Sequence, residues 1–275
     1  MAFNAGKLRV DPDEKFNLKR RDPAETFDIS KQQARKEVED HVKQLAELHE
    51  LLYAEHRRAL LIILQGMDAA GKDGTIRHVM SGVNPQGCSV VSFKQPSAKE
   101  LDHDFLWRIH AAVPEKGSIG IFNRSQYEDV LIVRVHKLMP KSVWEARYEQ
   151  INAFERILSQ NDVCVLKFFL HISREEQEKR FQARLNDPQK NWKASVADFR
   201  ERDYWDEYQQ AYEDAISKCS TKDAPWYIIP SDHKWFRNYC VSHIVVSTLE
   251  SFHMHYPKAS PDVAGVEKGG KTAAR

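Results

Sequence analysis

The chain has 275 residues, of which 41% are hydrophobic and 29% are charged, as is typical of a folded protein with a substantial core. Its formal net charge is only +1, so a site for a polyanion has to be built from a local cluster of cations. Because general attraction to polyanions is missing, we expect no nucleic-acid partner.

The sequence contains no sign of export or membrane insertion. No apolar run approaches the length of a transmembrane helix, and residues 1–7 lack the apolar core of a signal peptide. The four cysteines are far apart and form no C-x-x-C pair, as in a reduced intracellular protein. We therefore expect a cytoplasmic protein without a membrane partner.

The predicted elements alternate between helix and strand. Residues 1–30 are polar with scattered prolines and are expected to form an irregular arm, and residues 257–275 a disordered tail. Apolar spacings of three and four predict an amphipathic helix over 31–58. Apolar runs predict strands at 60–65, 88–93, 119–122, 163–170 and 226–229. Further helices are expected after Gly74 and over 99–112, 142–159, 174–186, 204–218 and 234–253.

Strands that alternate with helices, and several of which are continuously apolar, indicate a parallel sheet covered on both faces. We predict a single α/β domain over residues 31–256. Functional sites in such folds lie at the carboxyl ends of the strands. The segments 66–75 and 123–136, which follow two of the predicted strands, are therefore the first candidates for a site.

The segment after the first predicted strand has the spacing of a phosphate-binding loop, G-x-x-x-x-G-K. Its backbone N–H groups and the start of the next helix would bind phosphates, and Lys72 would add a mobile ammonium. Asp73 occupies the position where a Ser or Thr usually contacts Mg²⁺, and the loop also contains Asp68. A carboxylate beside phosphates makes sense if a metal ion lies between them. The candidate phosphate-binding positions are Gly66, Ala69, Ala70, Gly71, Gly74 and Thr75. A strand-turn-helix with a chance Gly-Lys pair is the alternative.

A second group of polar residues follows the third predicted strand. Arg124 would contact a phosphate, with Asn123 beside it, and Asp129 or Glu128 would hold Mg²⁺. We expect Arg134 to point toward the same centre. The alternative is an exposed turn with salt bridges on its surface.

A third group, from 179 to 203, is rich in basic residues and is interrupted by Asp187-Pro188. Arg180 and Arg184 are one helical turn apart and share a face. We interpret the segment as a lid that closes over phosphates and excludes water. Its candidate binding residues are Arg180, Arg184, Lys190, Lys193 and Asp198. The alternative is a solvated helical hairpin, because charged runs are usually surface.

Taken together, these stretches resemble the family-2 polyphosphate kinases. The similarity rests on 66–75, on 122–131 (Phe-Asn-Arg-Ser-Gln-Tyr-Glu-Asp-Val-Leu), on 186–193 and on Trp226–Pro230 with Lys234–Arg237. The resemblance implies a P-loop kinase-like, thymidylate-kinase-like three-layer α/β/α sandwich with a helical lid, and homo-oligomers (dimers or tetramers). It also implies dependence on Mg²⁺, with Mn²⁺ as a substitute.

The resemblance further implies reversible phosphoryl transfer between inorganic polyphosphate and nucleotides. Asn123 and Glu128 are similar to the subclass that phosphorylates both AMP and ADP, yielding ADP and ATP. The expected catalytic residues are Asp68, Lys72, Arg124 and Asp129, with Asp68, Asp129 and Glu128 as metal ligands.

Two other functions remain open from the residues alone. The first is an ATP-dependent nucleotide or small-molecule kinase on the same fold, but such kinases generally retain a hydroxyl after the loop lysine, where this chain has Asp73. The second is a non-catalytic regulator that binds polyanions or nucleotides, but a pure phosphate-binding site would lack the acids beside the loop.

Overall fold

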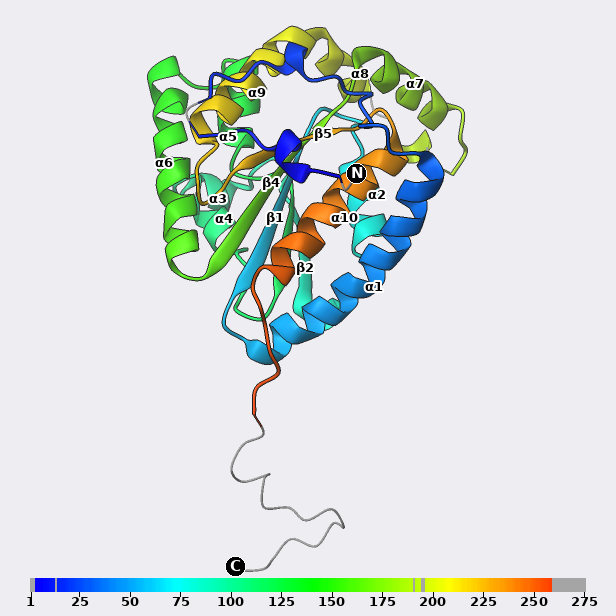
Figure 1. Ribbon diagram of the computed structural model, residues 1–275. Coiled ribbons are helices and arrows are strands. Elements are labelled where there is room, and N and C mark those ends of the chain that lie inside the picture. Colours follow the sequence, from blue (N-terminus) through cyan, green and yellow to red (C-terminus); the bar gives the residue numbers. More distant parts are fainter. Residues whose placement is uncertain (1–2, 13, 190, 194–195, 259–275) are drawn as a thin grey trace, which may run out of the picture.

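A five-stranded parallel sheet forms the centre of the protein (Figure 1). The computed structural model describes residues 3–12, 14–189, 191–193 and 196–258. The strand order is β2-β3-β1-β4-β5, so the first strand lies in the middle of the sheet. The strands are β1 (Ala59–Gln65), β2 (Cys88–Ser92), β3 (Ile119–Asn123), β4 (Val163–His171) and β5 (Trp226–Pro230). All five predicted strands are confirmed to within a residue at each end.

Helices cover both faces of the sheet, and together with it they make the predicted three-layer α/β/α arrangement. Helices α1, α2 and α10 pack together on one face, and α5, α6 and α9 pack together on the other. The helices are α1 (Lys31–Glu55), α2 (Lys72–Val79), α3 (Ala98–Leu101), α4 (Trp107–His110), α5 (Glu128–Val135), α6 (Lys141–Gln160), α7 (Arg174–Leu185), α8 (Val196–Glu201), α9 (Trp205–Cys219) and α10 (Lys234–Glu250).

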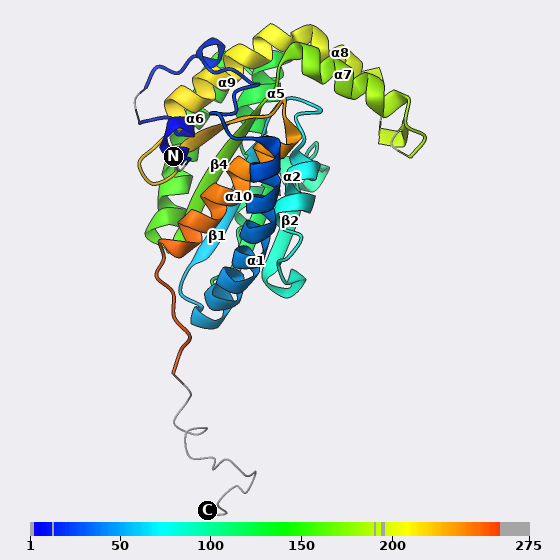
Figure 2. The same ribbon diagram turned by 45° about the vertical axis from the view of Figure 1, so that its right-hand side comes forward.

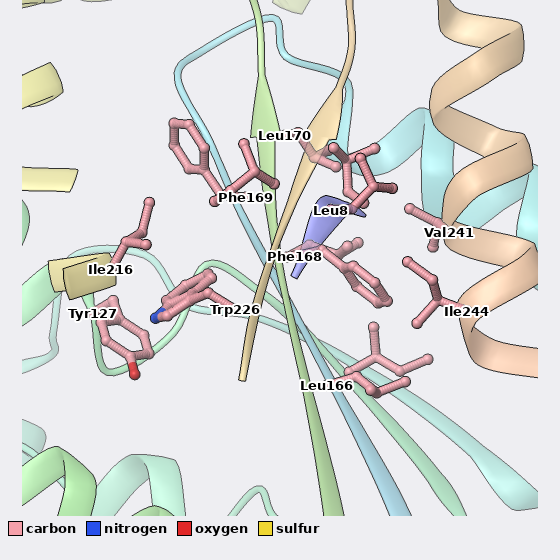
Figure 3. Close-up of a cluster of buried hydrophobic side chains, with 14 of the residues drawn as sticks. Leu8, Tyr127, Leu166, Phe168, Phe169, Leu170, Ile216, Trp226, Val241 and Ile244 are labelled. Atoms are coloured by element: carbon pink, nitrogen blue, oxygen red, sulfur yellow. The ribbon is translucent and has the colours of Figure 1, made fainter. Parts of the chain in front are cut away.

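The core lies on both faces of the sheet because successive side chains of a strand point to opposite sides. In β1, Leu60 and Ile62 belong to the core beneath α10, whereas Leu61 and Ile63 pack in the cluster that includes Phe154 of α6. Figure 3 shows the same division for β4 and β5. Phe168 faces Val241 and Ile244 of α10, and Trp226 lies on the other side with Tyr127 and Ile216.

The N-terminal arm contains two short 3-10 helices, Ala5–Leu8 and Leu18–Arg20, and is attached to the outer edge of β5. Val10 donates its N–H to the Trp226 carbonyl (2.9 Å), and Arg9 forms an antiparallel bridge with Tyr227. Leu8, Val10 and other apolar residues of the arm are buried. The arm therefore protects one edge of the sheet and contributes to the core.

The structure differs from the predicted elements in three places. Residues 99–112 form two short helices, α3 and α4, instead of one. Helix α5 was not predicted, although its apolar residues are buried. Helix α8 lies in the segment expected to be broken and polar. Lys190 and residues 259–275 lie outside the described residues. In the described part of the chain, no helix has the length and apolar character needed to cross a membrane.

Candidate active site

The loop between β1 and α2 has the backbone shape of a phosphate-binding loop. Gly66 and Gly71 have φ values of 151° and 108°, in the region that favours glycine. A Cβ on Gly71 would collide with the guanidinium of Arg237, so only glycine fits there. Helix α2 begins at Lys72, directly after Gly71. Because the first N–H groups of a helix lack intrahelical partners, they are available to an anion at this point.

Lys72 is folded back against the loop rather than facing solvent. Its Nζ donates to the carbonyl of Gly66 (2.6 Å) and more weakly to that of Met67 (3.4 Å). Burial lowers the pKa of Lys72, and the nearby carboxylate of Asp68 opposes this shift. The ammonium is thus held next to the loop, ready to accept anionic partners in place of neutral carbonyls.

Two polar contacts join the loop to the end of β3. Arg124 Nη2 lies 3.0 Å from Asp68 Oδ1, and Asn123 Nδ2 donates to Asp73 Oδ1 over 2.8 Å. The backbone of Arg124 has a φ of 64°, which is unusual for a residue with a side chain. Such strained positions cluster at functional sites. The predicted proximity of the first two motifs is therefore present in the structure.

Glu128 and Asp129, the two consecutive acids of the second motif, lie in different surroundings. Glu128 lies among the charges of Arg124, Lys72 and Asp68, and burial raises its pKa while Arg124 and Lys72 oppose that rise. The buried amide of Gln65, oriented so that its oxygen and nitrogen are both paired, donates to Glu128 Oε1 (3.1 Å). Glu128 therefore lies beside the loop, as expected.

Asp129 does not lie beside the loop. Its carboxylate accepts a hydrogen bond from Arg147 of α6 (3.0 Å), and burial raises its pKa. Since an α-helix rotates by 100° per residue, the two neighbouring acids of α5 cannot both face the loop. The structure thus corrects the expectation that Asp129 and Asp68 share a metal ion.

Arg134 is also directed away from the phosphate-binding loop, contrary to expectation. Its Nη1 is 2.6 Å from Asp214 of α9, and its guanidinium lies over the Trp144 ring at 4.9 Å. Its place one and a half turns into α5 brings it to the interface with α6 and α9. Arg134 holds these helices together and does not reach the phosphate-binding loop.

The lid segment projects from the end of the sheet at which the strands finish (Figure 2). Arg180, at its base, is not a mobile cation, because its guanidinium is buried and donates to backbone carbonyls. Nη1 donates to Ala69 and Ala70 (3.0 Å each), and Nη2 donates to Ser231 and Asp232. This corrects the expectation for Arg180, which supports the loop from behind.

Arg184, one turn further along α7, lines the same cavity and lies over the Phe181 ring. Its expected role in binding phosphates remains a prediction. Lys193 lies in a short 3-10 helix, Asn191–Lys193, and Asp198 lies in α8. The side chains of Lys193 and Asp198, like the whole of Lys190, lie outside the described part.

A cavity of about 1260 Å³ opens at the loop, and cations dominate its lining. Among the described lining residues, nine are Lys or Arg and three are Asp or Glu. The lining cations are Arg35, Lys72, Arg77, Lys94, Arg124, Arg180, Arg184, Lys234 and Arg237. The protein therefore has the local cluster of cations that a polyanion site needs when the net charge is close to zero.

Some predicted phosphate-binding residues lie behind this cavity rather than in its wall. Ala69, Gly71, Gly74 and Asn123 line the cavity, whereas Gly66, Ala70 and Thr75 do not. The Thr75 hydroxyl is bonded to the Gly71 carbonyl (3.1 Å) and closes the first turn of α2. Thr75 thus shapes the helix start and offers no free hydroxyl to a ligand.

Sequence reasoning missed several members of the cavity wall. Arg35 comes from α1, Arg77 from α2 and Lys94 from the segment after β2. No local pattern distinguishes them from ordinary surface cations. Lys234 and Arg237 belong to the motif 234–237, to which the sequence pattern gives no role of its own. Its position directly after the last strand was the signal that could have identified them.

The acids suit a metal that takes few protein ligands. No cluster of three or more His, Cys, Asp or Glu side chains that could hold a metal occurs within the described residues. Asp68, with Glu128 close by, provides carboxylate oxygens beside the loop. Mg²⁺ is commonly held by one or two carboxylates together with substrate phosphates and water. The residues present therefore fit Mg²⁺ bound with a phosphate substrate.

Comparison with known proteins identifies the family. The family model for polyphosphate kinase 2 matches residues 28–257. The chain belongs to the polyphosphate kinase 2 family. It is therefore a phosphotransferase that uses polyphosphate, as the resemblance implied. The matched range includes the loop, the second motif and the lid segment of this polyphosphate kinase 2.

Its relatives extend over nearly the whole chain. An AMP/ADP-polyphosphate phosphotransferase from Meiothermus ruber is 52% identical over 254 residues, 92% of this chain and 95% of the relative. An ADP-polyphosphate phosphotransferase from Rhodopseudomonas palustris is 48% identical over 274 residues, 95% of each chain. The crystal structure of polyphosphate kinase 2 from Arthrobacter aurescens has a TM-score of 0.92 and 42% identity, and the match covers 96% of this chain and 95% of that one. The three-layer kinase fold is thereby confirmed.

Proposed function

We propose that this enzyme transfers phosphoryl groups reversibly between inorganic polyphosphate and AMP or ADP, yielding ADP and ATP. The observation that carries the proposal is the cavity at the loop, which is lined by nine cations and three acids among the described residues; two of the cations, Arg180 and Arg237, are hydrogen-bonded to the backbone of the loop. Polyphosphate has neither base nor sugar, so a wall of cations is sufficient to bind it. The names of the relatives from Meiothermus ruber and Rhodopseudomonas palustris support AMP and ADP as acceptors.

The chemistry that the residues have to perform is mainly electrostatic. The acceptor is a nucleotide phosphate, which is already anionic near neutral pH, so no strong general base is needed. Two polyanions must instead be brought in line and their charge offset. Donor and product bonds are both phosphoanhydrides, so the reaction runs in either direction.

The side chains around the loop divide this task. Lys72 and the N–H groups at the start of α2 hold the phosphates next to the transferred group. Arg124, which is paired with Asp68 in this structure, offsets charge on the transferring phosphoryl group. Arg184 closes the site from the lid side, where water would otherwise compete as acceptor.

We assign the metal to Asp68, with Glu128 nearby. A bound Mg²⁺ would supply positive charge between donor and acceptor phosphates, and Mn²⁺ suits the same oxygen ligands. Asp68 lies at the cavity wall and Glu128 just behind Arg124. The finer predictions of a cytoplasmic location and a homo-oligomer remain predictions.

The decisive experiment uses purified protein, Mg²⁺, AMP or ADP, and either polyphosphate or ATP as the only phosphoryl donor. Formation of ADP and ATP from AMP with polyphosphate supports the proposal. Transfer from ATP alone would instead indicate the ATP-dependent kinase. Binding without turnover for either donor would indicate the regulator, and Lys72→Ala provides the inactive control.

A further inference from the structure

Helix α6 contacts the chain on both sides of Glu128, and it does so through two charged residues buried in the protein. Glu155 accepts hydrogen bonds on the N-terminal side of Glu128, and Arg147 donates on the C-terminal side. We propose that Glu155, with its partner Lys167, and Arg147 are positioning residues that hold Glu128 and Arg124 in register with the phosphate-binding loop. This inference rests on the proposed role of Glu128 in phosphoryl transfer.

The N-terminal side is held by a buried polar network, and among its described side-chain atoms only Oε1 of Gln126 lacks a hydrogen-bond partner. Gln126 Nε2 and Tyr127 Oη both donate to Glu155 Oε1, over 3.0 and 2.9 Å. Lys167 Nζ donates to Glu155 Oε2 (2.6 Å), to Tyr127 Oη (2.8 Å) and to the Cys219 carbonyl (2.5 Å). Lys167 Nζ therefore donates three hydrogen bonds, and the Glu155 carboxylate accepts three.

This network is completely removed from solvent. The side chains of Lys167 and Glu155 are 0% and 1% exposed, and Gln126 and Tyr127 are fully buried. Tyr127 packs edge-to-face against Trp226 with 4.7 Å between ring centroids, as Figure 3 shows for the two side chains. A buried ion pair is a weak source of stability, because desolvation offsets most of the attraction. What this pair does provide is a unique position for the residues hydrogen-bonded to it.

The C-terminal side is held by Arg147, eight residues before Glu155 on the same helix. Its Nη1 donates to both the backbone carbonyl and the carboxylate of Asp129, over 3.0 Å each. The guanidinium is itself fixed over the Phe105 ring at 4.6 Å. Glu128 thus lies between two anchored neighbours, Tyr127 and Asp129. This also explains why Asp129 is an acid, although it does not face the loop.

The position of Glu128 relative to the phosphate-binding loop matters because Glu128 and Arg124 belong to the same short turn. Arg124 has a left-handed backbone and pairs with Asp68, and the charge of Glu128 acts on Arg124 and Lys72. A displacement of about 1 Å in such a group lowers turnover by about 10²-fold. Loss of the contacts from α6 should therefore displace this turn and lower turnover.

A matched pair of double variants separates positioning from simple stability. Glu155→Gln with Lys167→Met removes both buried charges but keeps the side-chain oxygen that accepts from Gln126 and Tyr127. Glu155→Leu with Lys167→Met also removes the charges and lacks that acceptor. With polyphosphate and ADP, below the melting transition of both proteins, we expect kcat of the Leu variant to be about tenfold or more below that of the Gln variant. The KM for polyphosphate should change little.

A second measurement links the effect to Glu128. Glu128→Gln is combined with the Leu double variant in a double-mutant cycle. If the network acts through Glu128, the losses in kcat are far from additive. Equal kcat in the two double variants, or additive losses in the cycle, would overturn the proposal.

Two controls keep the result interpretable. If the Leu double variant does not fold, Arg147→Met is compared with Arg147→Lys, because these substitutions alter only the contact with Asp129. The Met variant should have the lower kcat. Equal kcat values in the two variants would overturn the proposal. Amide hydrogen exchange of residues 124–129 provides a readout that does not depend on turnover, and it should be faster without the acceptor at position 155. Wild-type protein that fails to use polyphosphate refutes the proposed function instead, while unchanged exchange refutes only the role of α6.

Discussion

Asp68 of the phosphate-binding loop and Arg124 at the end of β3 form an ion pair with 3.0 Å between Oδ1 and Nη2. Both side chains are partly exposed at the cavity wall. In the proposed site, a phosphate would compete with Asp68 for the guanidinium, and a metal ion would compete with Arg124 for the carboxylate. The ion pair therefore joins the two side chains that we propose for substrate and for metal.

The two aspartates that were expected to share a metal should behave differently. Asp68→Asn removes a charge at the cavity wall and should lower turnover by on the order of 10²-fold or more, the scale of losing one preorganised electrostatic group. Added Mg²⁺ should partly restore it. Asp129→Asn should remain close to wild type, because the amide oxygen still accepts from Arg147. Turnover measured over a range of Mg²⁺ concentrations tests both, and an equal loss in the two variants would return Asp129 to the metal site.

Lys72→Ala should reduce turnover with polyphosphate by about 10²–10³-fold, because Lys72 supplies charge where the transferring phosphoryl group lies. Its Nζ also donates to the Gly66 carbonyl, so the variant should melt at a slightly lower temperature than wild type. Lys43→Ala, which alters an exposed lysine of α1, is the matched control. Steady-state kinetics and a thermal melt are the measurements, and near-normal turnover would remove Lys72 from the reaction.

Arg180 and Arg184 are one turn apart but should give opposite phenotypes. Arg180→Ala removes the guanidinium that donates to four backbone carbonyls. Among the described residues, only the Ala70 carbonyl keeps another side-chain donor, Arg237, so the substitution should lower the free energy of unfolding by about 3 kcal/mol or more. Arg184→Ala should leave stability nearly unchanged, raise the KM for polyphosphate and weaken its dependence on salt. Denaturant unfolding and kinetics at two ionic strengths distinguish them. A stable Arg180→Ala protein with weakened polyphosphate binding would restore its role as a lid cation.

The pH profile of kcat/KM, which reports the groups of the free enzyme, should have limbs set by Glu128 and Lys72. Burial raises the pKa of Glu128 from 4.5, so its carboxylate is lost as the pH falls through a value above 4.5. Burial lowers the pKa of Lys72 from 10.5, so its positive charge is lost as the pH rises through a value below 10.5. Activity should therefore fall on both sides, and Glu128→Gln should lack the acidic limb. An acidic limb that persists in this variant belongs to another group.

Glu128 should also influence the choice of acceptor. AMP has one phosphate fewer than ADP to fill the space between the nucleoside and the reaction centre. An acid beside Arg124 and Lys72 can help metal or water to occupy that space. Glu128→Asn should therefore lose the AMP step more than the ADP step, measured as the ratio of the two kcat/KM values. Equal losses would assign Glu128 to catalysis in general.

The sequence by itself determined the elements that depend on local pattern. The five predicted runs became the five strands, and the side chains of β1, β3, β4 and β5 are nearly all buried, as in parallel strands covered on both faces. β2, at the edge of the sheet, is the exception and is mostly exposed. The glycine and lysine spacing of 66–75 predicted a phosphate-binding loop at the end of β1, and the structure has Gly71 there with a φ of 108°, in the region that favours glycine. These features are encoded within about ten residues of chain, and they were sufficient to point to the family.

Only the tertiary structure decided which side chains face the loop. Glu128 and Asp129 are adjacent in sequence, yet the pitch of α5 turns one toward Lys72 and the other toward Arg147. Arg180 and Arg184 share a helix face, but only Arg180 donates hydrogen bonds to the carbonyls of Ala69 and Ala70. The partners of these charges come from elements far away in sequence. Because a charged residue looks the same in sequence whether it binds substrate or supports the backbone, packing alone separates the two roles.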